Sequence, residues 1–248
     1  MMKYQEASSY LNSFIDYESI LSYNYRHSYS LKNLHCLLSH LRNPQNNYLS
    51  IIVTGTKGKG SVANILSSVI SRSGVRTGLF TSPHLLCIRE RIKIDGVYIS
   101  KKDFAKYVAL IKSVIIRKSV KGLTYFEILT AVGFLAFKEK EVEIAVLEVG
   151  LGGRLDAVNT ASNDISVITP ISYDHTHLLG KSLRKIAKEK CGIIKNNSFV
   201  ITAPQKREVL SVIKQVSDQK NARLFCVSVD KEVNKTRISL KGSSFSVK

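Results

Sequence analysis

A short segment near residue 50 restricts the possible folds of this chain more than any other. An apolar run over 49–54 leads into a glycine-rich stretch, and a helical pattern follows over 61–73. This order is typical of a phosphate-binding loop, because glycines let backbone N–H groups surround phosphate oxygens and the helix N-terminus adds positive potential. Lys59 is placed to reach nucleotide phosphates, and the hydroxyl of Ser61 to face Mg²⁺. The segment predicts a βα unit that binds ATP.

The match to the standard loop pattern is incomplete. GxxxxGK[ST] requires a glycine where this chain has Val53, and a hydroxyl residue directly after the lysine, where it has Gly60. Taken alone, the loop is also compatible with a glycine-rich turn that carries an ordinary surface lysine. The rest of the chain has to decide between these two interpretations.

Strand-like and helical segments alternate along most of the chain. They predict an α/β fold, a doubly wound and mostly parallel sheet in which ligands bind at the carboxyl ends of strands. A polar hairpin is expected around Asp95 and Gly96. The expected strands are 49–54, 75–80, 143–149, 164–169, 199–203 and 223–228, and the expected helices are 61–73, 102–117, 126–139, 182–190 and 206–219.

Three parts are expected along the sequence. Residues 1–48 read as a helical segment packed on the main domain, with leucines at helical spacing over 31–41. The alternating pattern of 49–230 predicts one nucleotide-binding domain. The polar residues 231–248 are expected to form a linker.

Composition excludes several classes of protein. The 248 residues are 44% hydrophobic, yet no apolar run approaches the ~20 residues of a membrane-spanning helix. Scattered cysteines without a CxxC pair favour reduced thiols in a cytoplasmic protein. The net charge of +18 is spread over the chain without a tight basic run, so we expect a surface suited to polyanionic small molecules rather than nucleic acid.

Several further segments, in order along the chain, carry a family resemblance. The longest is LEVGLGGRLDAVN at 147–159; the others are 33–45, 55–61, 81–85, 89–92, 124–127, 174–176 and 189–195. Together they resemble the bifunctional dihydrofolate synthase/folylpolyglutamate synthase family, within the Mur ligase superfamily. The segments 124–127 and 152–156 favour this family over the peptidoglycan-precursor ligases of the same superfamily.

The resemblance implies an ATP-dependent ligase of folate biosynthesis. A substrate carboxylate attacks the γ-phosphate to give an acyl phosphate, and the amino group of L-glutamate then displaces phosphate. The first acceptor is dihydropteroate, and later acceptors are reduced folates. Such a reaction depends on positioning and on charge stabilisation at the transferred phosphoryl group.

The resemblance also implies roles for individual residues. ATP would be bound by Thr56, Lys57, Gly58, Lys59, Gly60 and Ser61. Two Mg²⁺ sites would use Ser82, Glu148 and His175, and Lys190 would be carbamylated, so that Lys59, His175 and Lys190 are the catalytic set. Considered alone, Ser82 also suits a turn or helix cap, His175 a structural role and Lys190 a helix surface. Glu148 ends an apolar strand, where a carboxylate requires a partner such as a metal.

For the pterin ring, the resemblance implies two segments, Thr124, Tyr125, Phe126 and Glu127, and Leu155, Asp156 and Ala157. An aromatic ring can stack on a pterin, and a carboxylate can accept hydrogen bonds from its amino-pyrimidine edge. Core packing at the start of an apolar helix is the alternative for Phe126.

Two departures from the family qualify this interpretation. Lys57 stands where the family usually has Asn, so it either adds a phosphate contact or weakens nucleotide binding by repelling Lys59. Family members also continue into a second α/β domain, which lies outside this sequence. We therefore expect a monomer that binds Mg·ATP weakly and does not turn over alone. The alternatives are a non-catalytic nucleotide-binding remnant or another Mur-type amide ligase.

Overall fold

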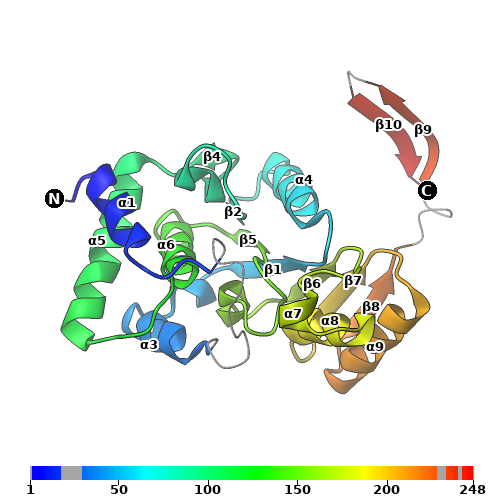
Figure 1. Ribbon diagram of the computed structural model, residues 1–248. Helices are drawn as coiled ribbons and strands as arrows, with labels where there is room; N and C mark the ends of the chain where they lie inside the picture. Colours follow the sequence, from blue (N-terminus) through cyan, green and yellow to red (C-terminus); the bar gives the residue numbers. More distant parts are fainter. Residues whose placement is uncertain (1, 18–29, 228–232, 240–241, 248) are drawn as a thin grey trace.

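A single large sheet organises the molecule. The structure is a computed structural model that describes residues 2–17, 30–227, 233–239 and 242–247. Its eight-stranded sheet has the order β4-β3-β2-β5-β1-β6-β7-β8 (Figure 1). The pairs from β2 to β8 are parallel, whereas β3 and β4 add an antiparallel edge. The strands are β1 Leu49–Thr54, β2 Thr77–Phe80, β3 Ile92–Ile94, β4 Val97–Tyr98, β5 Ile144–Glu148, β6 Ile165–Ile168, β7 Phe199–Thr202 and β8 Arg223–Cys226.

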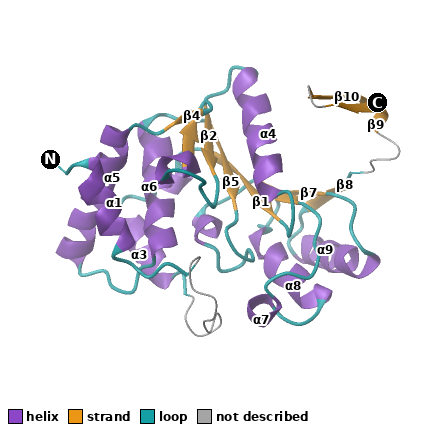
Figure 2. Cartoon of the chain, turned by 45° about the horizontal axis from the view of Figure 1, so that its top comes forward, coloured by secondary structure: helices purple, strands orange, loops and turns teal. Residues whose placement is uncertain are grey.

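Helices cover both faces of this sheet, because alternate residues of a strand point to opposite faces. Figure 2 shows α4 on one side of the sheet and α5 and α6 on the other. Ile51 and Val53 pack with α4, whereas Ile52, between them, belongs to the core formed with α5 and α6. A third apolar cluster joins β6 and β7 to α8 and α9. The helices are α1 Tyr4–Asn12, α3 Lys32–His40, α4 Lys59–Arg72, α5 Lys101–Lys118, α6 Tyr125–Glu139, α7 Thr176–Leu179, α8 Leu183–Lys190 and α9 Arg207–Gln219.

The fold class expected from the sequence is confirmed, and most element bounds agree within two or three residues. The hairpin around Asp95 and Gly96 is present as β3 and β4. Helix α4 begins at Lys59 rather than at residue 61, so the lysine of the loop lies in the first helical turn. The short helix α7 was not expected from the sequence.

The C-terminal segment differs from the expected linker. Strands β9 Val233–Ser239 and β10 Gly242–Val247 form a two-stranded antiparallel sheet, which Figure 1 shows apart from the main sheet. The polar and serine-rich sequence of this segment lacks the apolar alternation by which a half-buried strand is predicted, so the hairpin was not expected.

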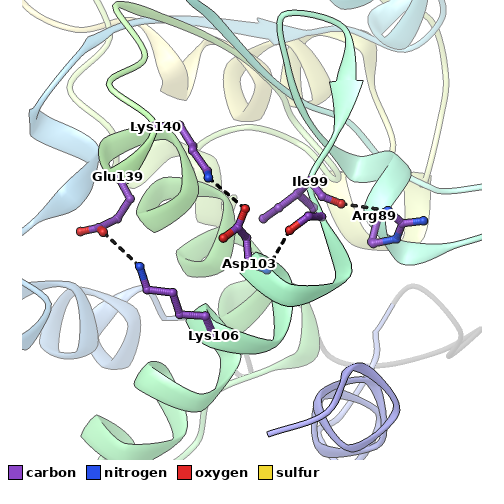
Figure 3. A network of polar contacts seen from close by, with 7 residues as sticks. Arg89, Ile99, Asp103, Lys106, Glu139 and Lys140 are labelled. Carbon is purple, nitrogen blue, oxygen red and sulfur yellow. Dashed lines mark hydrogen bonds and ion pairs between the residues drawn. The ribbon is translucent and has the colours of Figure 1, made fainter. Parts of the chain in front are cut away.

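Two ion pairs join α5 to the C-terminal end of α6 (Figure 3). Lys140 Nζ lies 2.9 Å from Asp103 Oδ2, and Lys106 Nζ lies 3.4 Å from Glu139 Oε2. Helix α1 packs on the same side, where Tyr4 and Phe104 make an edge-to-face contact at 5.6 Å. None of the described helices combines the length and the apolar composition that a membrane crossing requires.

Candidate functional site

The strand order creates a crevice beside β1. The chain leaves β1 towards β2 on one side and later enters β6 on the other, so the loops after β1, β5 and β6 meet at the carboxyl edge of the sheet. Such a switch point is the usual ligand site of a doubly wound sheet. Every residue of the expected phosphate loop lies in the first of these loops or in the helical turn that follows it.

Backbone geometry fixes the loop after β1. Gly58 is left-handed at φ 82° and directly precedes α4. Gly55 has φ 147°, and a Cβ atom there would collide with the side chain of Thr169, so only glycine fits. Thr56 ties the loop to the segment after β6: its N–H donates to the Pro170 carbonyl at 3.0 Å and its hydroxyl to the Ser172 carbonyl at 3.1 Å.

The loop thereby presents the start of α4 to solvent. Lys57 is exposed and Lys59 partly exposed, so both ammonium groups are available to an anion. Free N–H groups at the first turn of a 14-residue helix add to this positive potential. Ser61 is exposed, and its hydroxyl makes no hydrogen bond to the described residues.

Glu148 joins three segments of the crevice. It is the last residue of β5 and only 5% exposed. Its Oε2 accepts a hydrogen bond from the Ser82 N–H at 3.1 Å. A Cβ atom on Gly60 would lie 3.3 Å from Glu148 Oε1, so the carboxylate lies directly against the first turn of α4. The expected neighbourhood of Ser82, Glu148 and the phosphate loop is therefore present.

These oxygen donors fit Mg²⁺. Within the described ranges no group of three or more His, Cys, Asp or Glu side chains is arranged to hold a metal ion. Mg²⁺ in nucleotide sites needs no such cage, because one or two carboxylates, water and substrate phosphates complete its six positions. A buried carboxylate and a serine beside a phosphate loop are the donor set that such a site requires.

His175 lies at the same edge of the sheet, in the segment after β6. It follows β6, has a left-handed backbone at φ 44°, and begins α7. Its Nε2 lies 3.5 Å from Asp174 Oδ1, and its ring lies 6.3 Å from that of His177.

Lys190 is buried, contrary to the surface position that its helix pattern alone suggests. It ends α8, is 2% exposed, and donates from Nζ to the Gly55 carbonyl at 2.6 Å. Burial, and then the charge of Lys59, lower the pKa of Lys190 from 10.5 to about 8. At neutral pH about a tenth of this amine is therefore uncharged, the form that can act as a nucleophile.

Residues 124–127 have structural roles at the start of α6. Thr124 and Glu127 form a capping box: Glu127 Oε2 accepts the Thr124 N–H at 2.8 Å, and Thr124 Oγ1 accepts the Glu127 N–H at 3.2 Å. Tyr125 is buried. Phe126 is different, because it is only partly buried, contacts Phe80 edge-to-face at 5.8 Å and lies under the loop after β5. Of these residues, Phe126 is the best placed to contact a ligand.

The loop after β5 holds the second expected pterin segment. Asp156 accepts the Leu151 N–H at 2.9 Å and the Val158 N–H at 3.0 Å, and so shapes its own loop. Leu155 is partly exposed and Ala157 is buried. Gly153 packs on the Lys190 carbonyl, where a Cβ atom would approach to 2.7 Å. This loop thus lies on the C-terminal end of α8.

One residue that sequence reasoning missed organises the loop after β2. Glu90 accepts three backbone N–H groups, from Leu85 at 2.8 Å, Leu86 at 2.9 Å and Cys87 at 2.7 Å. These bonds outweigh desolvation and lower the pKa of Glu90. The spacing from Cys87 to Glu90 is that of a capping box, which was the available sequence signal.

Comparison with known proteins agrees with this geometry. The sequence model of the Mur ligase middle domain matches residues 53–248, which include the phosphate loop, Glu148 and Lys190. The chain belongs to the Mur ligase family. It is 37% identical over 216 residues to a folylpolyglutamate synthase of Lacticaseibacillus casei, covering 86% of this chain and 49% of the relative.

Other members of the Mur ligase family give the same result. A dihydrofolate synthase/folylpolyglutamate synthase of Mycobacterium tuberculosis is 44% identical over 175 residues, covering 66% of this chain and 36% of the relative. A solved structure described as the apo form of L. casei FPGS superposes with a TM-score of 0.89 at 33% identity, covering 98% of this chain and 58% of that one. The chain spans about half the length of such relatives, or less.

Proposed function

We propose that this chain carries the nucleotide-binding portion of an ATP-dependent ligase that joins L-glutamate to dihydropteroate or to reduced folates. The observation that carries the proposal is the convergence of three groups at one edge of the sheet: the phosphate loop, the buried Glu148 and the buried Lys190. Relatives named for folylpolyglutamate synthesis support it, as does a similar structure described as an FPGS–AMPPCP–folate complex.

The proposed reaction proceeds in two steps. A substrate carboxylate oxygen attacks the γ-phosphorus of ATP, the bond to the β-phosphate oxygen breaks, and ADP leaves. The neutral amine of L-glutamate then attacks the acyl carbon, phosphate leaves, and the amine loses a proton as the amide forms. Lys59 and the N–H groups of α4 stabilise the negative charge on the phosphates.

Each remaining residue takes a role in this proposal. Glu148 and Ser82 would hold a first Mg²⁺ with the nucleotide phosphates, which neutralises their charge. His175 would bind a second Mg²⁺. The uncharged Lys190 amine would add CO₂ with loss of a proton and so become an anionic carbamate beside that position. Phe126 and the loop 155–157 would contact the pterin.

Substrate binding tests the proposal without requiring turnover. Titration calorimetry with Mg·AMPPCP present would compare dihydropteroate and tetrahydrofolate with a UDP-linked muramoyl peptide. We expect a folate-type ligand to bind, with an affinity about fivefold lower in Phe126→Ala, since one aromatic contact contributes roughly 1 kcal/mol. Phe199→Ala removes a partly exposed ring elsewhere and serves as the control.

Two results would contradict the proposal. Nucleotide binding without any folate-type binding would favour a non-catalytic nucleotide-binding protein. Preference for the muramoyl compound would favour a peptidoglycan-precursor ligase of the same family.

A further inference from the structure

The loop after β5, which carries the second expected pterin segment, is fastened to the chain that follows α8. The residue that fastens it is Lys195, which lies between the short 3₁₀ turn Cys191–Ile193 and β7. Its Nζ donates to the Asn159 carbonyl at 2.9 Å and to Asn159 Oδ1 at 2.8 Å. One charged group therefore holds both the backbone and the side chain of Asn159.

Asn159 in turn binds two further backbone groups. Its Nδ2 donates to the Arg154 carbonyl at 3.0 Å and to the Gly192 carbonyl at 3.1 Å. The side-chain amide therefore uses both of its donor hydrogens and its acceptor oxygen. These bonds join the residue before the pterin segment to the turn that directly follows Lys190.

Close packing at the same joint leaves the loop little room to shift. The Arg154 N–H donates to the Glu189 carbonyl at 2.9 Å. A Cβ atom on Gly153 would lie 2.7 Å from the Lys190 carbonyl oxygen, and one on Gly192 would collide with Arg154. The pterin segment and the end of α8 that carries Lys190 therefore share one joint.

The charge of Lys195 is held against neutral oxygens. In the part of the chain that the structure describes, this lysine forms no ion pair. Burial, and then the charge of Lys220, lower the pKa of Lys195 from 10.5 to about 8. Charge-assisted hydrogen bonds are about twice as strong as neutral ones, so the two bonds to Asn159 offset the cost of this burial.

The side chain of Lys195 is not needed to anchor its own segment. The Lys195 carbonyl accepts a hydrogen bond from Ser198 Oγ at 2.8 Å, and β7, which follows, pairs with β6 and β8. The two bonds from Nζ act on the loop after β5 instead. Asp156, the carboxylate of the expected pterin segment, belongs to that loop.

We propose that Lys195 is a positioning residue for the pterin site: through Asn159 it holds Asp156 at a fixed place relative to the Lys190 end of α8. A substrate bound at one end by Asp156 must bring its carboxylate to the nucleotide phosphates, so the reaction requires a fixed separation between the two. Lys195 itself touches neither substrate. The identity of the ligand rests on the proposed function, whereas the positioning rests on the hydrogen bonds above.

Amide hydrogen exchange of the intact chain tests the positioning without any ligand. Asp156 accepts the N–H groups of Leu151 and Val158, so the exchange rates of these two amides report on the place of its carboxylate. We expect Lys195→Met to speed their exchange by about tenfold, and Lys195→Arg, which keeps charged donors, by about threefold or less. Lys220→Met, the same change at the exposed neighbouring lysine, should leave both rates unchanged.

Ligand binding separates positioning from general stability. In titration calorimetry, Lys195→Met should lower the affinity for dihydropteroate or tetrahydrofolate by about tenfold. Its affinity for Mg·AMPPCP should stay within about twofold of the unchanged chain, because the bonds of Thr56 fasten the phosphate loop separately. Adding Lys195→Met to Asn159→Ala should cause no further loss of folate affinity, since the lysine acts through that residue.

Three results would overturn the positioning role of Lys195. One is unchanged exchange of the Leu151 and Val158 amides in Lys195→Met. Another is an equal loss of affinity for the folate-type ligand and for Mg·AMPPCP, because the lysine would then only stabilise the fold. The third is additive losses in the double variant, which would show that Lys195 does not act through Asn159. If the unchanged chain binds no folate-type ligand, the proposed function fails, and the exchange rates alone decide for or against the positioning.

Discussion

The carboxyl edge of the sheet and the outer side of α5 and α6 use charged residues in opposite ways. At the carboxyl edge, Glu148 and Lys190 are 5% and 2% exposed, and each is held by a backbone group of another segment. Between α5 and α6, the side chains of Lys106 and Glu139 are 56% and 47% exposed and meet only through a surface ion pair (Figure 3).

This difference separates buried charges at the proposed site from solvated charges on the outer helices. Burying an ionised group costs several kcal/mol unless partners compensate, whereas an exposed ion pair contributes about 0–1 kcal/mol. Two buried charged residues beside a glycine-rich loop therefore need a functional explanation, and the pairs on α5 and α6 do not. Each of the following predictions tests that contrast.

The largest effect is expected at Gly55. Gly55→Ala should lower the free energy of unfolding by about 3 kcal/mol or more, because the residue has φ 147° and the new methyl group meets Thr169. Gly74→Ala is the matched control, since it has φ 89° with open space around it, and it should cost about 1 kcal/mol. If urea unfolding gave the same loss of unfolding free energy for Gly55→Ala and Gly74→Ala, the loop after β1 would not be tightly packed around Gly55.

Lys190 should make stability depend on pH. Its folded pKa of about 8 lies below its ordinary 10.5, so the unfolded chain binds more protons in this window. Between about pH 8 and pH 10.5, the free energy of unfolding of the wild-type chain should therefore rise by up to about 3 kcal/mol more than that of Lys190→Met. Lys188→Met, exposed on the same helix, should follow the wild type. Parallel pH profiles for wild type and Lys190→Met would contradict the burial of a charged amine.

Glu148→Gln should weaken nucleotide binding only when Mg²⁺ is present. The substitution keeps the shape but removes the negative charge, so the affinity for Mg·AMPPCP should fall by about tenfold or more. In EDTA, Glu148→Gln should bind AMPPCP at least as tightly as the unchanged chain, because it removes a carboxylate that repels the nucleotide phosphates. Glu139→Gln provides the exposed control. An equal loss with and without Mg²⁺ would mean that Glu148 acts on the loop and not on a metal.

The smallest effect is expected from the ion pair between Asp103 and Lys140. A double-mutant cycle with Asp103→Asn and Lys140→Met should give a coupling energy of about 1 kcal/mol or less, since both side chains are partly exposed. A coupling energy of several kcal/mol would remove the contrast between the two regions.

Local patterns predicted the strands and the glycine-rich turn between β1 and α4 well, because buried parallel strands are nearly continuous apolar runs and glycine turns are short-range features. Lys190 shows the limit of predictions from local sequence patterns. Its neighbours on α8 are charged, and its burial depends on the Gly55 carbonyl, 135 residues away in the chain. The capping box of Thr124 and Glu127 is likewise legible in sequence, but a resemblance alone assigned those residues to a ligand.

Nucleotide binding tests the central claim most directly. Calorimetric titration with Mg·AMPPCP would compare the chain with Lys59→Ala and Lys57→Asn. We predict binding by the unchanged chain, loss of binding in Lys59→Ala, and a smaller change in Lys57→Asn, because Lys57 is exposed and precedes the helical turn that carries Lys59. Binding that survives in Lys59→Ala, or no binding by either the unchanged chain or Lys57→Asn, would contradict a working phosphate loop at this edge of the sheet.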